Sequence, residues 1–204
     1  CRLGIENSHS ELFEKEFAKY HNAKYCLAIA NGTVAIETAL KSAGMQPGDE
    51  VIVPSITFIA TASAVLMARG IPVFADIIPE TCQIDPKDIE QKITRRTRGI
   101  IVVHYAGYPA EMDRIIEIAK KHNLRILEDC SHSHGSLYKG KLTGTFGDVS
   151  AFSLMSGKGF AIGEAGILLT DDREIYERAI IFAHYERHSE ITLDYLKKGA
   201  GIPW

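Results

Sequence analysis

The chain has 204 residues, of which 46% are hydrophobic and 24% charged, and it carries a net charge of −3 with a pI near 6.3. This composition is ordinary for a soluble globular protein with one large α/β domain, and it gives no reason to expect nucleic acid or an anionic membrane as a partner. The apolar stretches are far shorter than the roughly 20 residues that span a bilayer, so we expect no membrane segment.

The first part of the chain alternates between helical and strand patterns. Apolar residues at helical spacing predict helices, and short apolar runs that end at Pro, Gly or Asn predict buried strands. In chain order the predicted elements are a helix over 10–20, a strand over 25–30, a helix over 34–43, and then a strand over 51–53, a helix over 57–68 and a strand over 72–75.

The alternation continues after a polar segment that spans residues 76–98. The further predicted elements are a strand over 99–103, a helix over 112–122, a strand over 125–129, a glycine-rich loop or hairpin over 135–147, strands over 149–152 and 166–170, and a helix that Asp171 and Asp172 cap and that ends near Ala183. Helices and strands in this order predict a mostly parallel sheet with helices on both faces.

The four cysteines are Cys1, Cys26, Cys82 and Cys130. They are widely spaced and form no Cys-x-x-Cys pair, which favours a reducing cytoplasm. The start of the chain has neither an initiator Met nor the apolar core of a secretory signal. Because the end also reads as an interrupted loop, we expect a fragment of a longer protein.

Asn31-Gly32-Thr33 lies between a predicted strand and a predicted helix. A Gly-Thr pair there lets backbone N–H groups and one hydroxyl approach an anion at the positive helix end. The alternative is a plain helix cap, in which Thr33 satisfies the first free amides. By itself the motif favours the cap.

Lys158 stands among small residues, Ser156-Gly157-Lys158-Gly159. The spacing fits neither a Walker A loop nor a dinucleotide-binding glycine motif. A solvated lysine in a flexible turn is one interpretation. The other is a ligand site, because a strand-like segment precedes the lysine and its small neighbours permit close approach of the backbone to a ligand.

The segment from Glu128 to His134 combines two carboxylates, a thiol and two imidazoles. A metal site built from Asp129, His132 and His134 is one hypothesis. A second takes Asp129 as the ion partner of a cofactor, with His132 as a hydrogen-bonding group nearby. The third is a loop with surface histidines.

Together these motifs resemble the DegT/DnrJ/EryC1/StrS family, the sugar aminotransferases of pyridoxal-phosphate fold type I. The resemblance runs from about Glu11 to His188. Its carriers are Asn31-Gly32-Thr33, Ala39-Leu40, residues 47–61, residues 72–76, Ile84-Asp85-Pro86, residues 104–109, Glu128-Asp129, His134-Gly135, Gly147-Asp148, Phe152-Ser153, Lys158 and Gly163-Glu164.

The resemblance implies a three-layer α/β/α fold with a mostly parallel mixed sheet and pyridoxal 5′-phosphate as the cofactor. It implies an N-terminal helical segment over 1–22, a cofactor-binding large domain over 23–188 and, over 189–204, the start of a linker to an absent small C-terminal domain. It also implies a homodimer with active sites at the subunit interface.

The resemblance assigns roles at matching positions. Lys158 would form the imine with the cofactor aldehyde and then transfer protons, and Asp129 would keep the ring nitrogen protonated. The remaining expected contacts are Gly32, Thr33 and Ser153 to the phosphate, Phe58 to the ring face and His132 to the phenolic oxygen of the ring. The alternative for Phe58 is core packing early in a helix.

The chain departs from the family pattern at two places that alter no expected catalytic group. Gly159 follows the lysine where Asn is common, and residues 163–166 read Gly-Glu-Ala-Gly instead of Gly-Glu-Gly-Gly. Lysine rather than histidine at position 158 argues against the dehydratase branch of the family.

We therefore expect a pyridoxal-phosphate aminotransferase that converts a keto-sugar, expected to be nucleotide-linked, to an amino sugar with L-glutamate as the donor. Neither a metal nor nucleic acid is expected to take part. The alternatives are a cyclitol aminotransferase of the same family and a truncated, non-catalytic remnant that binds the cofactor or a partner.

Overall fold

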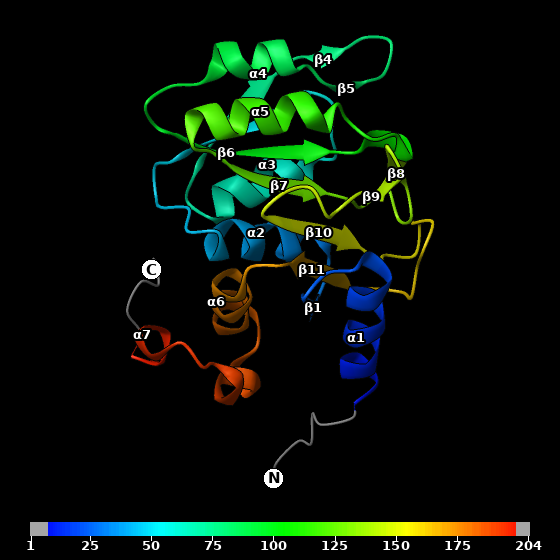
Figure 1. Cartoon of the computed structure of the whole chain (residues 1–204), viewed down its shortest axis with the longest axis vertical. Helices are drawn as coiled ribbons and strands as arrows, with labels where there is room; N and C mark the ends of the chain where they lie inside the picture. Colours follow the sequence, from blue (N-terminus) through cyan, green and yellow to red (C-terminus); the bar gives the residue numbers. More distant parts are fainter. Residues whose placement is uncertain (1–7, 199–204) are drawn as a thin grey trace.

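A computed structural model describes residues 8–198 of the chain (Figure 1), and a seven-stranded sheet forms its centre. The strands of this sheet are β1 (Tyr25–Ile29), β2 (Glu50–Pro54), β3 (Ile71–Ala75), β6 (Thr97–Val103), β7 (Arg125–Asp129), β10 (Val149–Ser153) and β11 (Gly166–Thr170). Their order is β1-β11-β10-β7-β6-β2-β3. Strand β11 runs antiparallel to both neighbours and the other adjacent pairs are parallel, so the predicted mostly parallel mixed sheet is confirmed.

Helices cover both faces of the sheet. They are α1 (His9–His21), α2 (Gly32–Ser42), α3 (Ile59–Met67), α4 (Pro86–Lys92), α5 (Met112–His122) and α6 (Arg173–Ala183), followed by a 3₁₀ segment η2 (Tyr185–Glu190) and the short helix α7 (Asp194–Lys197). Helices α2, α3 and α6 pack into one hydrophobic core on one face. Helices α4 and α5, together with α1 beyond them, cover the other face, so the molecule has three layers.

Strand β6 shows why the central strands are apolar along their whole length. Successive side chains of a strand point to opposite faces, and both faces of this sheet are covered. Ile101 and Val103 lie in the core under α2, whereas Ile100 and Val102 lie in the core under α5. All four side chains are buried.

The structure differs from the prediction in two helix starts and one missed segment, besides shifts of one or two residues at other ends. Helix α2 begins at Gly32 rather than at residue 34, because the side chain of Asn31 accepts a hydrogen bond from the Val34 N–H and caps the helix there. Helix α3 begins at Ile59, two residues later than predicted. The polar segment 76–98 contains a small hairpin, β4 (Ile77–Ile78) with β5 (Gln83–Ile84), before α4.

The later predicted elements agree more closely with the structure. The glycine-rich stretch forms the hairpin of β8 (Leu137–Tyr138) and β9 (Lys141–Leu142), and Asp172 caps α6 as predicted.

No helix within residues 8–198 is long and apolar enough to cross a membrane. Cys1 and the two ends of the chain lie outside the described residues.

Candidate active site

The carboxyl ends of the parallel strands meet at one edge of the sheet and border a cavity. In sheets of this kind ligands bind at that edge. The cavity has a volume of about 430 Å³. All the residues that the resemblance assigned to the cofactor line it: Gly32, Thr33, Phe58, Asp129, His132, Ser153 and Lys158.

Asp129 is the last residue of β7 and is buried. Its Oδ2 accepts a hydrogen bond from the Thr61 hydroxyl at 3.1 Å, and its Oδ1 accepts one from the Ser131 N–H at 3.1 Å. The Thr61 hydroxyl is in turn 2.7 Å from that of Thr57. The carboxylate is therefore held in place from two sides while it still borders the cavity. The spacing Thr57-x-x-x-Thr61 could have indicated this support, since the predicted helix over 57–68 would place both hydroxyls on one face, although in the structure Thr57 lies before the start of α3.

Lys158 lies in the turn after β10 and is half-buried, although both adjacent glycines are exposed. Its backbone N–H donates to the Met155 carbonyl at 3.0 Å, which closes the turn. Within residues 8–198 the ammonium group forms no ion pair. The side chain thus belongs to the cavity rather than to a freely solvated turn, and it carries the positive charge there.

The N-terminus of α2 is packed directly on β10. A Cβ at Gly32 would lie 2.6 Å from the Cβ of Ser153, so only glycine permits this close approach. Asn31 supplies the cap, which corrects the interpretation of Thr33 as the capping residue. The Thr33 hydroxyl is therefore not used by the cap, and Thr33 lines the cavity together with Gly32 and Val34 of the first helical turn.

Phe58 precedes α3 and lies at the mouth of the cavity. It is 66% exposed, so the alternative of core packing is wrong for this residue. A large aromatic ring that stays exposed beside a cavity is available to stack on a planar ligand.

His132 and His134 occupy different surroundings. His132 lines the cavity, where burial and the positive charge of Lys158 lower its pKa while Asp129 acts in the opposite direction. His134 instead packs between Phe152 and Phe160. In the described part of the chain the ligand atoms of Asp129, His132 and His134 do not come within 4.8 Å of one another, so the geometry does not assemble the hypothesised metal site.

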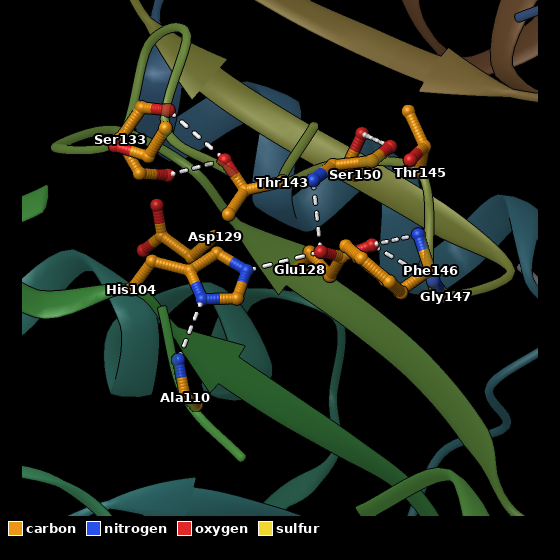
Figure 2. A network of polar contacts seen from close by, with 12 residues as sticks. His104, Ala110, Glu128, Asp129, Ser133, Thr143, Thr145, Phe146, Gly147 and Ser150 are labelled. Atoms are coloured by element: carbon orange, nitrogen blue, oxygen red, sulfur yellow. Dashed lines mark hydrogen bonds and ion pairs between the residues drawn. The ribbon is translucent and has the colours of Figure 1, made fainter. Parts of the chain in front are cut away.

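Glu128 lies on the opposite side of β7 from Asp129, and Figure 2 shows the polar network around it. Its carboxylate accepts a hydrogen bond from His104 Nε2 at 3.0 Å and from three backbone N–H groups at 2.7 to 2.8 Å, those of Gly144, Phe146 and Gly147. Although burial opposes it, His104 and the N–H groups of Gly147 and Gly144 hold the pKa of Glu128 below its usual range.

The thiol of Cys130 lies close to His104 and Glu128 and completes a potential metal-ligand group. Burial, then the charge of Glu128, raises the pKa of Cys130 well above its usual value, which disfavours the thiolate that a metal needs. The oxygens of Glu128 are also occupied by N–H donors, so we interpret this cluster as structural. Sequence reasoning assigned no role to His104.

The fold and the cavity together define a class of protein: a three-layer α/β/α domain whose strand-end cavity combines a lysine, a buried carboxylate and a glycine-opened helix N-terminus. The sequence model of the DegT/DnrJ/EryC1/StrS aminotransferase family matches residues 4–202. The chain therefore belongs to this family of pyridoxal-phosphate-dependent aminotransferases, as the sequence motifs predicted.

Characterised relatives are similar over most of this chain. It is 43% identical to GDP-perosamine synthase of Escherichia coli O157:H7 over 180 residues, which cover 88% of this chain and 50% of the relative. It is 39% identical to L-glutamine:scyllo-inosose aminotransferase of Streptomyces griseus over 179 residues, which cover 88% of this chain and 42% of that enzyme. The chain thus spans about half the length of the curated relatives that it matches.

Solved structures of other proteins share this fold. S. venezuelae DesV in complex with a ketimine intermediate matches with a TM-score of 0.86 and 37% identity, over 93% of this chain and 51% of that one. NtdA from Bacillus subtilis with bound cofactor PMP matches with a TM-score of 0.81 and 36% identity, over 86% and 40% of the two chains.

Proposed function

We propose that the protein to which this chain belongs is a pyridoxal-phosphate aminotransferase that converts a keto-sugar to an amino sugar. One observation carries the proposal: the half-buried Lys158 and the buried carboxylate of Asp129 line the same cavity as the N-terminus of α2. Amino-group transfer with this cofactor needs a lysine, a partner for the ring nitrogen and an anion site for the phosphate.

The residues present fit the cofactor. Gly32 brings the first N–H groups of α2 close to Ser153, and the phosphate would be held there by those groups and by the hydroxyls of Thr33 and Ser153. Phe58 would cover one face of the ring. His132 would donate a hydrogen bond to the ring oxygen.

When bound, pyridoxal phosphate supplies an electron-accepting ring and a carbonyl group that takes up the amino group. Asp129 favours the protonated ring nitrogen through its negative charge. Thr61 and the Ser131 N–H hold that carboxylate in one orientation, so it need not reorganise during the reaction. With the cofactor bound, the amine of Lys158 would serve as the general acid and base that takes up and returns a proton in the cavity.

For the substrate we propose a nucleotide-linked keto-sugar, with L-glutamate as the amino donor. The similarity to a GDP-perosamine synthase supports the sugar. The cyclitol alternative has its own support, because another relative is named as an L-glutamine:scyllo-inosose aminotransferase. Turnover of the full-length protein with sugar and cyclitol ketones, each with glutamate and with glutamine, separates these four combinations.

The test of the proposed function is cofactor attachment to Lys158. Added pyridoxal phosphate should give the absorption of a lysine-bound cofactor near the visible edge, and borohydride reduction should fix the cofactor to the peptide that contains Lys158. Lys158→Ala should lose both signals. Failure of the full-length protein to bind the cofactor contradicts the proposal and favours the non-catalytic remnant.

We further propose that the protein forms a homodimer through α3. The outward face of this helix, which consists of Ile59, Leu66 and Met67 and is called here the α3 face, is 71%, 61% and 48% exposed. Beside it, the edge strand β3 exposes Phe74. Exposed apolar residues gathered in one place are typical of protein interfaces. Because Met67 also lines the cavity, a second copy of the chain bound to the α3 face would lie at the cavity mouth, as expected for a dimer with its active sites at the interface.

We propose a reducing, cytoplasmic location for the protein. In the described part of the chain Cys26, Cys82 and Cys130 are free thiols, and burial leaves the first and the last of them inaccessible. Fractionation of cells that express the full-length protein tests this location.

We also propose that residues 1–22, 23–188 and 189–204 belong to three separate segments of the full-length protein. Limited proteolysis of the full-length protein tests it, since cuts should concentrate near residue 188.

A further inference from the structure

The turn that follows β6 has a strained backbone. Ala106, in the 3₁₀ turn η1 (Tyr105–Gly107), has φ +53° and ψ +21°, and Gly107 has φ +86°. The left-handed region is open to glycine, but it disfavours any residue with a Cβ. Contacts elsewhere must therefore hold Ala106 in this conformation.

The consequence of this conformation is a contact with the cavity histidine. The Ala106 N–H points to His132 Nδ1 and donates a hydrogen bond to it at 3.4 Å. A ring nitrogen that accepts a hydrogen bond carries no proton, so the proton of the neutral ring is on Nε2. His132 is thereby restricted to one tautomer, in which its only N–H is a donor on Nε2.

Gln83 on β5 braces the turn just before Ala106. Its Oε1 accepts from the Tyr105 N–H at 3.2 Å, and its Nε2 donates to the Tyr105 carbonyl at 3.1 Å. The side chain is almost fully buried, at 2% exposure. Ser136 braces the other side, because its hydroxyl donates to the Gly107 carbonyl at 2.8 Å.

The ends of the same turn are fixed by the network in Figure 2. His104 Nε2 donates to Glu128, and His104 Nδ1 accepts from the Ala110 N–H at 3.2 Å. Residues 104 and 110 are thus tied through one imidazole to the buried carboxylate. With both ends fixed, Gln83 and Ser136 determine the conformation between them.

We propose that Gln83 and Ser136 are positioning residues that hold Ala106 left-handed and so keep His132 as the neutral Nε2–H tautomer. The benefit to a ligand rests on the proposed function: the Nε2–H group of His132 would already be in place to donate a hydrogen bond to the anionic oxygen of the bound cofactor ring. A donor fixed in advance loses little free energy on binding.

The surroundings of His132 on balance favour the neutral ring as well, because burial, and after it the charge of Lys158, lowers its pKa. Lys158 faces it and disfavours a second proton, whereas Asp129 favours one; Tyr105 packs its ring against the imidazole at 5.7 Å between centroids. A positively charged His132 would carry an N–H on Nδ1 that opposes the Ala106 N–H. The turn and the lysine therefore both favour the neutral ring.

The experiment is nitrogen NMR of His132 in the full-length protein without cofactor. In the wild type we expect one tautomer, protonated on Nε2. Gln83→Met keeps the approximate shape of the side chain and removes both hydrogen bonds to Tyr105. The variant should populate both tautomers of His132. It should also raise the pKa of His132 by about half a unit to one unit, which corresponds to the loss of one hydrogen bond to the neutral ring. Gln46→Met, in an exposed turn, is the matched control and should change neither.

A wild-type His132 protonated on Nδ1 overturns the proposal, as does a Gln83→Met protein that folds and leaves His132 unchanged. If Gln83→Met does not fold, Ser136→Ala carries the same test with a smaller shift in the same direction, and no shift in that variant overturns the proposal. Because cofactor is absent, these outcomes are independent of whether Lys158 binds it.

A second readout connects the turn to the ligand. Gln83→Met should weaken cofactor binding about threefold to tenfold without removing the attachment to Lys158. In a His132→Gln background the same substitution should have little effect, because an amide offers an N–H donor without a choice of tautomer. An equal loss in both backgrounds contradicts the role of the tautomer.

Discussion

At the scale of single residues, two adjacent carboxylates on β7 have different roles. Asp129 and Glu128 are neighbours on one strand, yet they point to opposite faces. Asp129 receives few hydrogen bonds and borders the cavity, whereas Glu128 receives four and is enclosed. Carboxylates on two consecutive residues therefore serve chemistry on one face of the strand and structural support on the other.

Asp129→Asn should reduce amino-group transfer by about a hundredfold to a thousandfold, with cofactor binding largely retained. Asn keeps an oxygen for the Thr61 hydroxyl but lacks the negative charge that keeps the ring nitrogen protonated. Single-turnover conversion by the full-length enzyme with its amino donor measures the effect. Asp194→Asn, a solvent-exposed change of the same kind, serves as the control, and equal rates for the two variants would contradict the role of Asp129.

At the scale of elements, the position of α2 depends on one missing side chain. The helix begins at Gly32 because Asn31 caps it, and it reaches β10 because residue 32 has no Cβ. Gly166, at the start of β11, makes a similar approach: a Cβ there would lie 2.4 Å from the Asn31 carbonyl oxygen. The loop before α2 is thus enclosed on two sides, which fixes its N–H groups relative to the strand that leads to Lys158.

Gly32→Ala should lower the free energy of unfolding by about 1–3 kcal/mol, because the new methyl group overlaps Ser153. It should also weaken cofactor binding, since the helix must move away from the strand. Urea unfolding and a cofactor titration measure the two effects. A Cβ at Gly159 would meet no atom within 4 Å, so Gly159→Ala is the matched control for stability. If both variants unfold alike, the close approach is not what positions α2.

At the scale of the whole molecule, one side of the cavity mouth is bordered by apolar side chains that no other part of the described chain covers. The α3 face and Phe58 remain exposed beside the mouth, while the core on the inner side of α3 is fully buried through Ala64 and Val65. An exposed aromatic and an exposed helix face at a cavity mouth are what a partner subunit would cover.

Leu66→Glu should therefore weaken self-association of the full-length protein by about a hundredfold or more, since it buries a charge at the proposed interface. Sedimentation velocity over a range of concentrations measures it. Leu12→Glu, on the exposed side of α1 at 50% exposure, is the control that should leave association unchanged. A wild-type protein that stays monomeric at high concentration contradicts the dimer.

Most of the fold could be predicted because the signals are local. Continuous apolar runs, turn residues and helix caps placed nearly all of the larger elements within one or two residues. The hairpin of β4 and β5 escaped because each strand has two residues, too few to show a period. The start of α2 was displaced because either Asn31 or Thr33 could have capped the helix, and a sequence alone does not choose between them.

The sequence by itself determined the family, the sheet and the residues that belong to the cavity, because motif order and apolar periodicity are properties of the chain. Only the tertiary structure decided how those residues are supported. Thr61 reaches Asp129 across 68 positions, and Gln83 holds a turn that selects a proton on His132. Such contacts depend on which strand ends lie side by side and on individual hydrogen-bond directions, and neither leaves a periodic trace in the sequence.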